Sequence, residues 1–205
     1  MQEYLNRGDS YLVNLTFPTK VSFNGNLKDL FHNSQSQFKV LFKDQFVSYS
    51  PEFFINQREY HLFVPDKRDN LNGNSKCRTT RLGQPTKIAK HATIVGLIQN
   101  DLSSYAREVR VNRFRYVEQI KVQGESLLQV SSEIEGKLMD DWGPSLGNFL
   151  WHMLPAGSIS GAPKLKTLEI IQSVEVDSRG CYTRVSVCLN GQNPDSAVAI
   201  SFLEK

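Results

Sequence analysis

The sequence predicts an α+β domain with a largely antiparallel sheet, and three observations lead to this fold class. Strand-like runs rich in β-branched and aromatic residues alternate in blocks with segments whose apolar residues have helical spacing. The blocks lack the regular strand–helix–strand order of a parallel sheet. An Asn-Gly pair at 190–191 lies between two strand-like runs and is typical of a hairpin turn. At 205 residues, the chain is long enough for one domain with a sizeable core.

The first half of the chain is predicted to be mostly strands. Residues 11–17 combine β-branched and aromatic side chains until Pro18 ends the run. Leucine and phenylalanine at helical spacing predict a short helix over 27–32. The segment 65–85, which is rich in glycine, proline and polar residues, is expected to be a loop. Three further strands are expected at 38–42, 45–49 and 60–64.

The second half is predicted to carry the longer helices. Apolar residues at helical spacing predict helices over 86–104, 142–154 and 163–175. Pro163 suits the third of these helices, because the first position of a helix tolerates proline. The strands expected in this half lie at 109–111, 116–122, 127–135, 181–189 and 197–203.

Composition argues against a disordered, membrane or secreted protein. Hydrophobic residues make up 40% of the chain and charged residues 22%, which is ordinary globular usage. No apolar run approaches the roughly 18 residues of a membrane helix, and the N-terminus does not resemble a secretory signal. The three cysteines are an odd number without metal-ligand spacing, so we expect reduced thiols in a cytoplasmic protein.

Positive charge is concentrated in residues 66–90, where seven basic side chains stand against two acidic ones. Such a cluster could bind nucleic acid or another polyanion. A solvated loop and helix face would explain the same charge. No aromatic residue interrupts the segment to stack on bases, so we favour the solvated face and do not expect nucleic acid as a partner.

The most informative stretch is residues 155–164, Pro-Ala-Gly-Ser-Ile-Ser-Gly-Ala-Pro-Lys. Small residues let a backbone approach a ligand closely, and the first turn of the following helix presents unpaired N–H groups. We therefore expect the main-chain N–H groups of 157–164 to line a cleft that binds a carboxylate or phosphate. An ordinary glycine-rich start of a helix is the alternative.

These residues also resemble the signature of the chorismate-utilising enzymes. The run at 157–164, followed by a helix and Arg-Gly-Cys-Tyr-Thr at 179–183, is similar to their motif. The resemblance is closest to aminodeoxychorismate synthase component I of the short type. It implies two stacked, largely antiparallel sheets flanked by helices, with the active site between them. Further similar motifs follow in family order at 8–16, 50–52, 94–103, 127–136 and 195–204.

The resemblance implies a catalytic pair. Glu52 matches a glutamate thought to act as general acid on the C4 hydroxyl that leaves chorismate, and a carboxyl group beside an anionic substrate retains its proton more readily. Lys67 matches a lysine proposed to attack C2, which requires the neutral amine. A lysine at this position favours the aminodeoxychorismate branch over anthranilate synthases. The ordinary loop cation stays open as an alternative, because Arg68-Asp69 replaces the family's Gly-Thr.

Substrate binding is assigned by the same resemblance to the small-residue loop and one aromatic side chain. We expect the chorismate site to include Gly157, Ser158, Ile159, Ser160, Gly161, Ala162, Pro163, Lys164 and Tyr182.

The resemblance also implies Mg²⁺, which offsets the carboxylates of chorismate. The positions of two family glutamates of the metal site are Lys87 and Lys90 here, and a lysine cannot ligate Mg²⁺. We therefore expect no metal site on the helix predicted over 86–104. The other departures from the family pattern are Gly96, Gln99, Gln129 (at a family histidine), Arg184 and Ser201 (at a carboxylate-clamping arginine).

The function implied is amination of chorismate to 4-amino-4-deoxychorismate, for para-aminobenzoate and folate biosynthesis. Ammonia usually comes from a glutamine amidotransferase subunit. Residues 1–205 would form a single domain that lacks the family's usual upstream region and its last C-terminal segment. The alternative is a non-catalytic descendant or fragment that retains the scaffold. Titration with chorismate, with and without Mg²⁺, would be the most informative observation.

Overall fold

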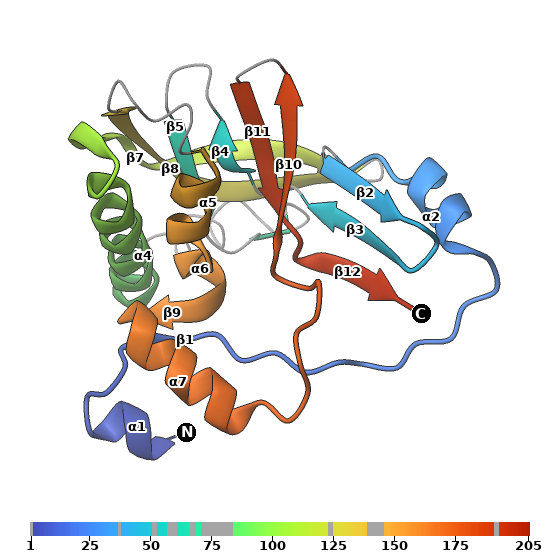
Figure 1. Ribbon diagram of the computed structural model, residues 1–205, viewed down its shortest axis with the longest axis horizontal. Helices are drawn as coiled ribbons and strands as arrows, with labels where there is room; N and C mark the ends of the chain where they lie inside the picture. The colour runs from blue at the N-terminus through green and yellow to red at the C-terminus, as the bar shows by residue number, and fades with distance from the viewer. Residues whose placement is uncertain are drawn as a thin grey trace.

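All strand pairs in the described part of the chain are antiparallel, and helices flank the sheets (Figure 1). This arrangement, taken from a computed structural model, confirms the predicted α+β class. No helix among the described residues is both long and apolar enough to cross a membrane. The structure describes residues 2–36, 38–50, 53–56, 61–65, 69–70, 84–122, 125–138, 146–190 and 193–205.

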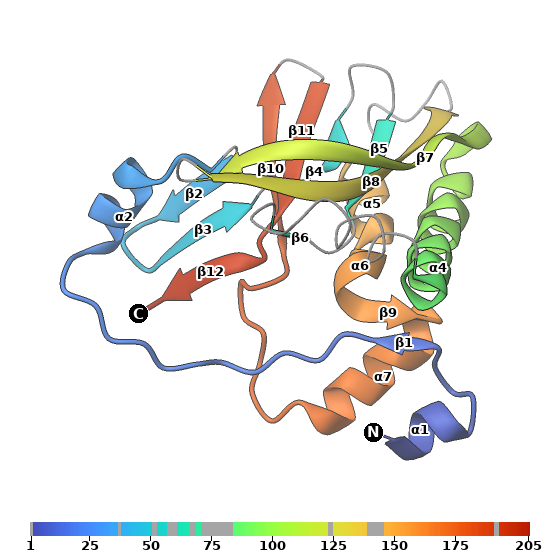
Figure 2. The same ribbon diagram turned by 180° about the vertical axis from the view of Figure 1, so that it is seen from behind.

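The largest sheet has seven strands in the order β10-β11-β4-β5-β8-β6, and β7 also pairs with β8. The β7–β8 ribbon is the longest pairing and crosses the back of the molecule (Figure 2). The strands of this sheet are β4 (Phe53–Asn56), β5 (His61–Pro65), β6 (Asp69–Asn70), β7 (Ala106–Val122), β8 (Glu125–Leu138), β10 (Val185–Asn190) and β11 (Asn193–Val198).

Helix α4 (Pro85–Ser103) packs on this sheet and matches the predicted helix within one residue at each end. The side chains of its inner face recur at helical spacing and are buried: His91, Ile94, Val95, Ile98 and Leu102. At the C-terminal end of α4, Gly136 of β8 allows close contact. A Cβ at Gly136 would lie 2.9 Å from Ala106 Cβ and 3.1 Å from a Leu102 methyl group. The core therefore lies between α4 and the inner face of β8.

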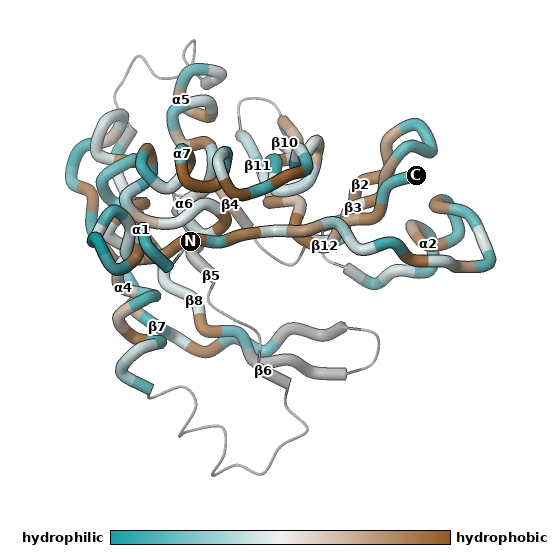
Figure 3. The backbone as a smooth tube through the Cα atoms, turned by 90° about the horizontal axis from the view of Figure 1, so that it is seen from below, coloured by the Kyte–Doolittle hydropathy of each residue, from teal (hydrophilic) through white to brown (hydrophobic). Residues whose placement is uncertain are grey.

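A second, three-stranded sheet has the order β12-β3-β2 and lies beside α2 on the far side from α4 (Figure 3). Asn26 caps α2 by accepting a hydrogen bond from the Asp29 N–H at 2.8 Å. The predicted strands 38–42 and 45–49 are confirmed and pair as a hairpin, whose turn residues Lys43 and Asp44 have positive φ. The elements are α2 (Leu27–Asn33), β2 (Phe38–Phe42), β3 (Phe46–Ser50) and β12 (Ser201–Glu204).

The base of the molecule is formed by α1, β1, α6, β9 and α7, and α5 lies above them beside α4 (Figure 1). β1 and β9 pair as a small two-stranded sheet, with α7 beside them. Residues 14–26, here called the strap, run in extended form along this base from β1 to α2 (Figure 2). These elements are α1 (Gln2–Asn6), β1 (Leu12–Val13), α5 (Leu146–Met153), α6 (Gly157–Ser160), β9 (Gly161–Ala162) and α7 (Lys164–Val174).

Several predicted strands were wrong in extent, and the one expected at 181–189 begins only with β10 at Val185. The run 11–17 forms a strand only at β1, because the residues that follow bond to loops and side chains. The strands expected at 109–111 and 116–122 are one strand, β7, whose register shifts permit an interrupted apolar pattern. The run 197–203 is divided between β11 and β12, which belong to different sheets. The helix predicted over 142–154 is α5, and residues 139–145 lie outside the described part.

Candidate functional site

The predicted substrate loop, residues 157–164, is built into the base of the molecule as α6, β9 and the start of α7. β9 pairs with β1 through Leu12↔Ala162 and Val13↔Gly161. Gly161 has φ +129, and a Cβ there would lie 1.9 Å from the Leu12 carbonyl oxygen. Only glycine permits this approach, so the second glycine of the motif is explained by strand pairing.

The amides of this loop are largely used by the chain itself. The N–H groups of Ile159 and Ser160 donate to the Ala156 carbonyl, and the N–H of Gly161 donates to the Gly157 carbonyl. Ile159, Ser160, Gly161 and Ala156 are all buried. The prediction that main-chain N–H groups here line an open cleft is therefore wrong for these three amides. The cause is the helical turn of α6, which the small-residue pattern did not reveal.

Lys164 is also committed to internal partners. Its Nζ lies 2.7 Å from Asp101 Oδ2 and donates at 3.3 Å to the carbonyls of His152 and Met153 at the end of α5. The two charged side chains are only 14% and 11% exposed. The ammonium group thus neutralises Asp101 and caps the C-terminus of α5. A direct role of Lys164 in binding substrate stays a prediction.

A second charged pair joins the strap to the loop. Arg179 donates to both carboxylate oxygens of Glu175, at 2.6 and 2.8 Å, and also to the carbonyls of Asn14 and Ile159. Its hydrogen bonds, with that from the Thr16 N–H, hold the pKa of Glu175 below its usual range. We call Arg179 and Glu175 the clasp. α7 ends at Val174 and Glu175 has extended backbone, so no helical i, i+4 signal in the sequence pointed to this pair.

A polar row follows β7 and β8 on the face of the sheet opposite to the core. Gln129 lies opposite Glu118, and Ser131 lies opposite Tyr116. The Ser131 hydroxyl donates to Glu118 at 2.7 Å. Burial, followed by the charges of Glu118 and Glu133, raises the pKa of Tyr116 far above its usual range. Glu118 is thus the acceptor of the Ser131 hydroxyl and one of the charges beside Tyr116.

Gln129 stands out in this row. It is only 4% exposed, yet its Oε1 has no hydrogen-bond partner within the part of the chain that the structure describes. A buried carbonyl oxygen without a donor is costly for folding. The same oxygen is ready to accept a hydrogen bond from a bound ligand. Gln129 occupies the position where the resemblance expects a histidine.

Both predicted catalytic residues, Glu52 and Lys67, lie outside the described residues. The nearest described neighbours of Lys67 on either side are Pro65 and Asp69. They pair with Ser131 and Leu128 of β8, which flank Gln129. Tyr182, predicted to bind substrate, packs its ring 6.0 Å from that of Phe202 on β12. Their roles stay predictions.

The residues at the expected metal positions do not fit Mg²⁺. Lys87 and Lys90 lie in the first turns of α4, half-buried and exposed respectively, and both carry an ammonium group where the metal needs oxygen ligands. Among the described residues, no three His, Cys, Asp or Glu side chains are grouped closely enough to hold a metal ion.

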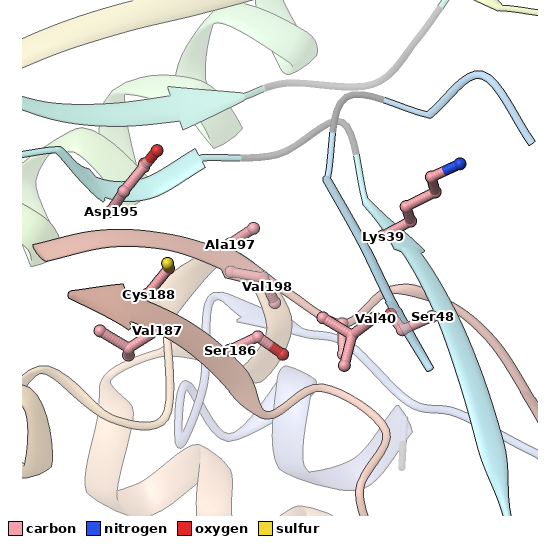
Figure 4. A pocket seen from close by; sticks show the side chains of 10 residues that line it. Lys39, Val40, Ser48, Ser186, Val187, Cys188, Asp195, Ala197 and Val198 are labelled. Carbon is pink, nitrogen blue, oxygen red and sulfur yellow. The ribbon is translucent and has the colours of Figure 1, made fainter. Parts of the chain in front are cut away.

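A cavity of about 170 Å³ lies between β2–β3 and β10–β11 (Figure 4). Its lining is mostly apolar, including Val40, Val187 and Val198, with Asp195 and Lys39 at its edges. Lys39 donates to the Phe31 and Ser34 carbonyls around the end of α2. None of the predicted substrate residues lines this cavity, so it is separate from the candidate site.

Comparison with known proteins adds the family. The sequence model of the family described as chorismate binding enzyme matches residues 67–204. This chain belongs to the chorismate-binding enzyme family. Its structure is similar to anthranilate synthase component I from Streptococcus pneumoniae TIGR4, with a TM-score of 0.76 and 22% identity, over 98% of this chain and 46% of that one. This likeness establishes the chorismate-enzyme fold that the resemblance implied.

Two curated relatives of this family member bear on its function. A Haemophilus influenzae protein named "Uncharacterized PabA-like protein" is 42% identical over 206 residues, which are all of this chain and 63% of that protein. Aminodeoxychorismate synthase component 1 of Bacillus subtilis is 27% identical over 198 residues, which are 89% of this chain and 41% of that protein. The chain thus spans less than two thirds of the length of either.

Proposed function

We propose that this chain is the chorismate-binding part of an aminodeoxychorismate synthase component I-like protein, which aminates chorismate to 4-amino-4-deoxychorismate for para-aminobenzoate and folate biosynthesis. The observation that carries the proposal is Gln129, a buried acceptor without a donor on β8. The strand residues on either side of it pair with the residues that flank Lys67 in sequence. The Bacillus subtilis relative supports the same branch of the family by its name.

The chemistry of chorismate fits an acceptor of this kind. A ring hydroxyl of the substrate would donate to Gln129 Oε1 and remove the cost of an unpaired buried oxygen, which is about 1–3 kcal/mol. Lys67 would then attack C2 as the neutral amine while Glu52 protonates the C4 hydroxyl, which leaves as water. Ammonia would add at C4 as the bond between C2 and Lys67 Nζ breaks, and a proton passed from the added nitrogen to the solvent would leave the amine product and the free lysine. A glutamine amidotransferase subunit would supply the ammonia.

The two substrate carboxylates require positive charge. Lys87 and Lys90 supply it as ammonium groups, which pair with carboxylates as point charges without the geometry of a metal. Binding should therefore be indifferent to Mg²⁺ and weaker at high salt, because salt screens charge pairs near the surface.

Calorimetric titration with chorismate tests the proposal. We expect binding to the 205-residue chain that does not change when Mg²⁺ is added and that weakens as salt increases. Gln129→Met, which keeps the length of the side chain and removes the acceptor, should abolish most of the binding. Absence of chorismate binding by the unaltered chain would overturn the proposal, and binding only in the presence of Mg²⁺ would overturn the role given to the lysines.

The second candidate is a non-catalytic descendant that binds chorismate without turning it over. It is favoured by Lys87 and Lys90 at two metal-site glutamates of the family and by Ser201 at the carboxylate clamp. Ammonia-dependent formation of product by this chain would exclude this second candidate. We expect little or no product from this chain, and Lys87→Glu with Lys90→Glu should not restore it. Turnover that depends on added Mg²⁺ would return the protein to the ordinary enzyme.

A further inference from the structure

We infer that Arg179 and Glu175, the clasp, are positioning residues that hold the strap against the candidate substrate loop. The inference rests on the proposed function only in assigning substrate to that loop. Neither residue belongs to the predicted catalytic or substrate-binding set. Both residues make contacts that join segments far apart in the sequence.

The hydrogen bonds of Arg179 connect three segments at one guanidinium group. Nη1 donates to the Ile159 carbonyl of α6 at 2.9 Å, and Nη2 donates to the Asn14 carbonyl of the strap at 2.6 Å. Nε and Nη2 also donate to the two oxygens of Glu175, which caps the end of α7. A planar group with several donors in fixed directions can make all these bonds at once, and an ammonium group cannot.

Glu175 completes the connection from the other side. Its Oε1 accepts hydrogen bonds from the Thr16 N–H at 2.8 Å and from the Thr16 hydroxyl at 3.2 Å. The carboxylate is 5% exposed and the guanidinium side chain 17% exposed, so solvent competes little for either. The charge pair therefore holds the strap in place from within the molecule, and it is not a surface salt bridge.

The strap in turn contacts the substrate loop directly. The Asn14 N–H donates to the Ser160 carbonyl at 3.1 Å, and its Nδ2 donates to the Ser158 carbonyl at 3.2 Å. The clasp holds Ile159 and Asn14 together across this contact. The position of α6 therefore depends on a residue 20 positions later in the chain.

Hydrogen exchange in Arg179→Ala tests the clasp. We expect amide protection to fall about tenfold or more in residues 12–16 and 157–162, and to stay unchanged in the β2–β3 hairpin, because the pair acts locally. Arg184→Ala is the matched control, since the Arg184 side chain is exposed and its Nε donates to the Gly180 carbonyl in the same turn. It should leave all three segments unchanged.

Chemical rescue adds a readout that a general loss of stability would not give. Methylguanidinium should restore protection in Arg179→Ala, whereas sodium chloride at the same ionic strength and Arg179→Lys should not. Chorismate affinity should fall about tenfold with the loss of protection and recover with methylguanidinium. If Arg179→Ala does not fold, Glu175→Gln replaces it in the exchange measurement.

The outcomes separate the clasp from the proposed function. Local loss of protection with no chorismate binding by the unaltered chain would retain the clasp and overturn the function. Unchanged protection at 12–16 and 157–162, equal loss throughout the molecule, or rescue by lysine or salt would overturn the clasp.

Discussion

Gln129 and Ser132 are both buried polar residues of β8, but they differ in whether the chain satisfies their hydrogen-bonding groups. The buried Gln129 Oε1 lacks a hydrogen-bond donor among the described residues. Ser132 lies three positions later and faces the core, and its hydroxyl has hydrogen-bond partners. The Ser132 hydroxyl accepts from the Arg115 N–H at 2.9 Å and pairs with His91 at 2.6 Å. Replacing each residue by an apolar one should therefore change the free energy of unfolding differently.

Gln129→Met should leave the free energy of unfolding unchanged or raise it by about 1 kcal/mol, because it removes an unpaired buried acceptor. Ser132→Ala should lower it by about 1–3 kcal/mol, because it leaves two partners unsatisfied. Urea denaturation followed by circular dichroism measures both. A Gln129→Met protein as unstable as Ser132→Ala would show that the Gln129 amide group makes hydrogen bonds on which the fold depends.

The lowered pKa of Glu175 predicts how stability depends on pH. Arg179 and Thr16 favour the carboxylate, so its contribution is fully present above the ordinary pKa of 4.5 and is lost as pH falls through the lower pKa of the folded state. The difference in unfolding free energy between the unaltered protein and Glu175→Gln should be largest near pH 7 and shrink below pH 4.5. A difference that is constant from pH 7 to pH 3 would contradict the charge pairing.

The sequence pointed to individual residues of the candidate site but not to the groups that they contact. Arg179 was visible as part of a family motif, yet its contacts with Asn14 and Ile159 bridge 165 and 20 positions. The engagement of Lys164 by Asp101 was equally hidden, because a free lysine and a paired one look the same in sequence. Glu52 and Lys67 lie outside the described residues, so their catalytic roles stay predictions.

Among the elements, those with local signals were predicted well. α4 follows from helical spacing over five turns, and the β2–β3 hairpin follows from two strand-like runs around a turn. The prediction missed the change of sheet between β11 and β12. Two residues, Ala199 and Ile200, make this change, and Ala199 bonds back to Arg184 through its N–H. Tertiary packing determines where a chain passes from one sheet to another, and a continuous apolar run in the sequence does not indicate that point.

A substitution at Gly161 tests the close pairing of β1 with β9. Gly161→Ala should lower the free energy of unfolding by about 2–4 kcal/mol, because its φ is positive and a Cβ would collide with the Leu12 carbonyl. Thermal denaturation measures the loss. Gly96→Ala is the control, since this glycine is exposed on α4 with open space around it and should gain about 0.5–1 kcal/mol. Equal stability of the two variants would refute the close approach.

Across the whole molecule, the first segments depend on the last ones. The Ser10 hydroxyl donates to the Ala162 carbonyl at 2.8 Å, 152 positions away, and lies 3.1 Å from the Thr167 hydroxyl. At the other end, Lys205 pairs with Asp44 at a separation of 161. Contacts of this kind close very long loops, and they are expected to form late in folding.

Ser10→Ala should therefore raise the unfolding rate and leave the refolding rate nearly unchanged, at a total cost of about 1–3 kcal/mol. Val47→Ala should slow refolding, because Val47 is buried and pairs with Leu41 in a short hairpin. Stopped-flow measurements across a range of urea concentrations give both rates. Slower refolding of Ser10→Ala would place the base of the molecule in the early nucleus.

The strap has a consequence during synthesis on the ribosome. Residues 14–16 leave the exit tunnel early, but Ser158, Glu175 and Arg179, to which they bind, are translated 144 to 165 positions later. At about 5–20 residues per second, the strap waits roughly 7–33 seconds for its partners. During that time the polar groups of Asn14 and Thr16 that later bind these partners are open to solvent and to chaperones that bind nascent chains.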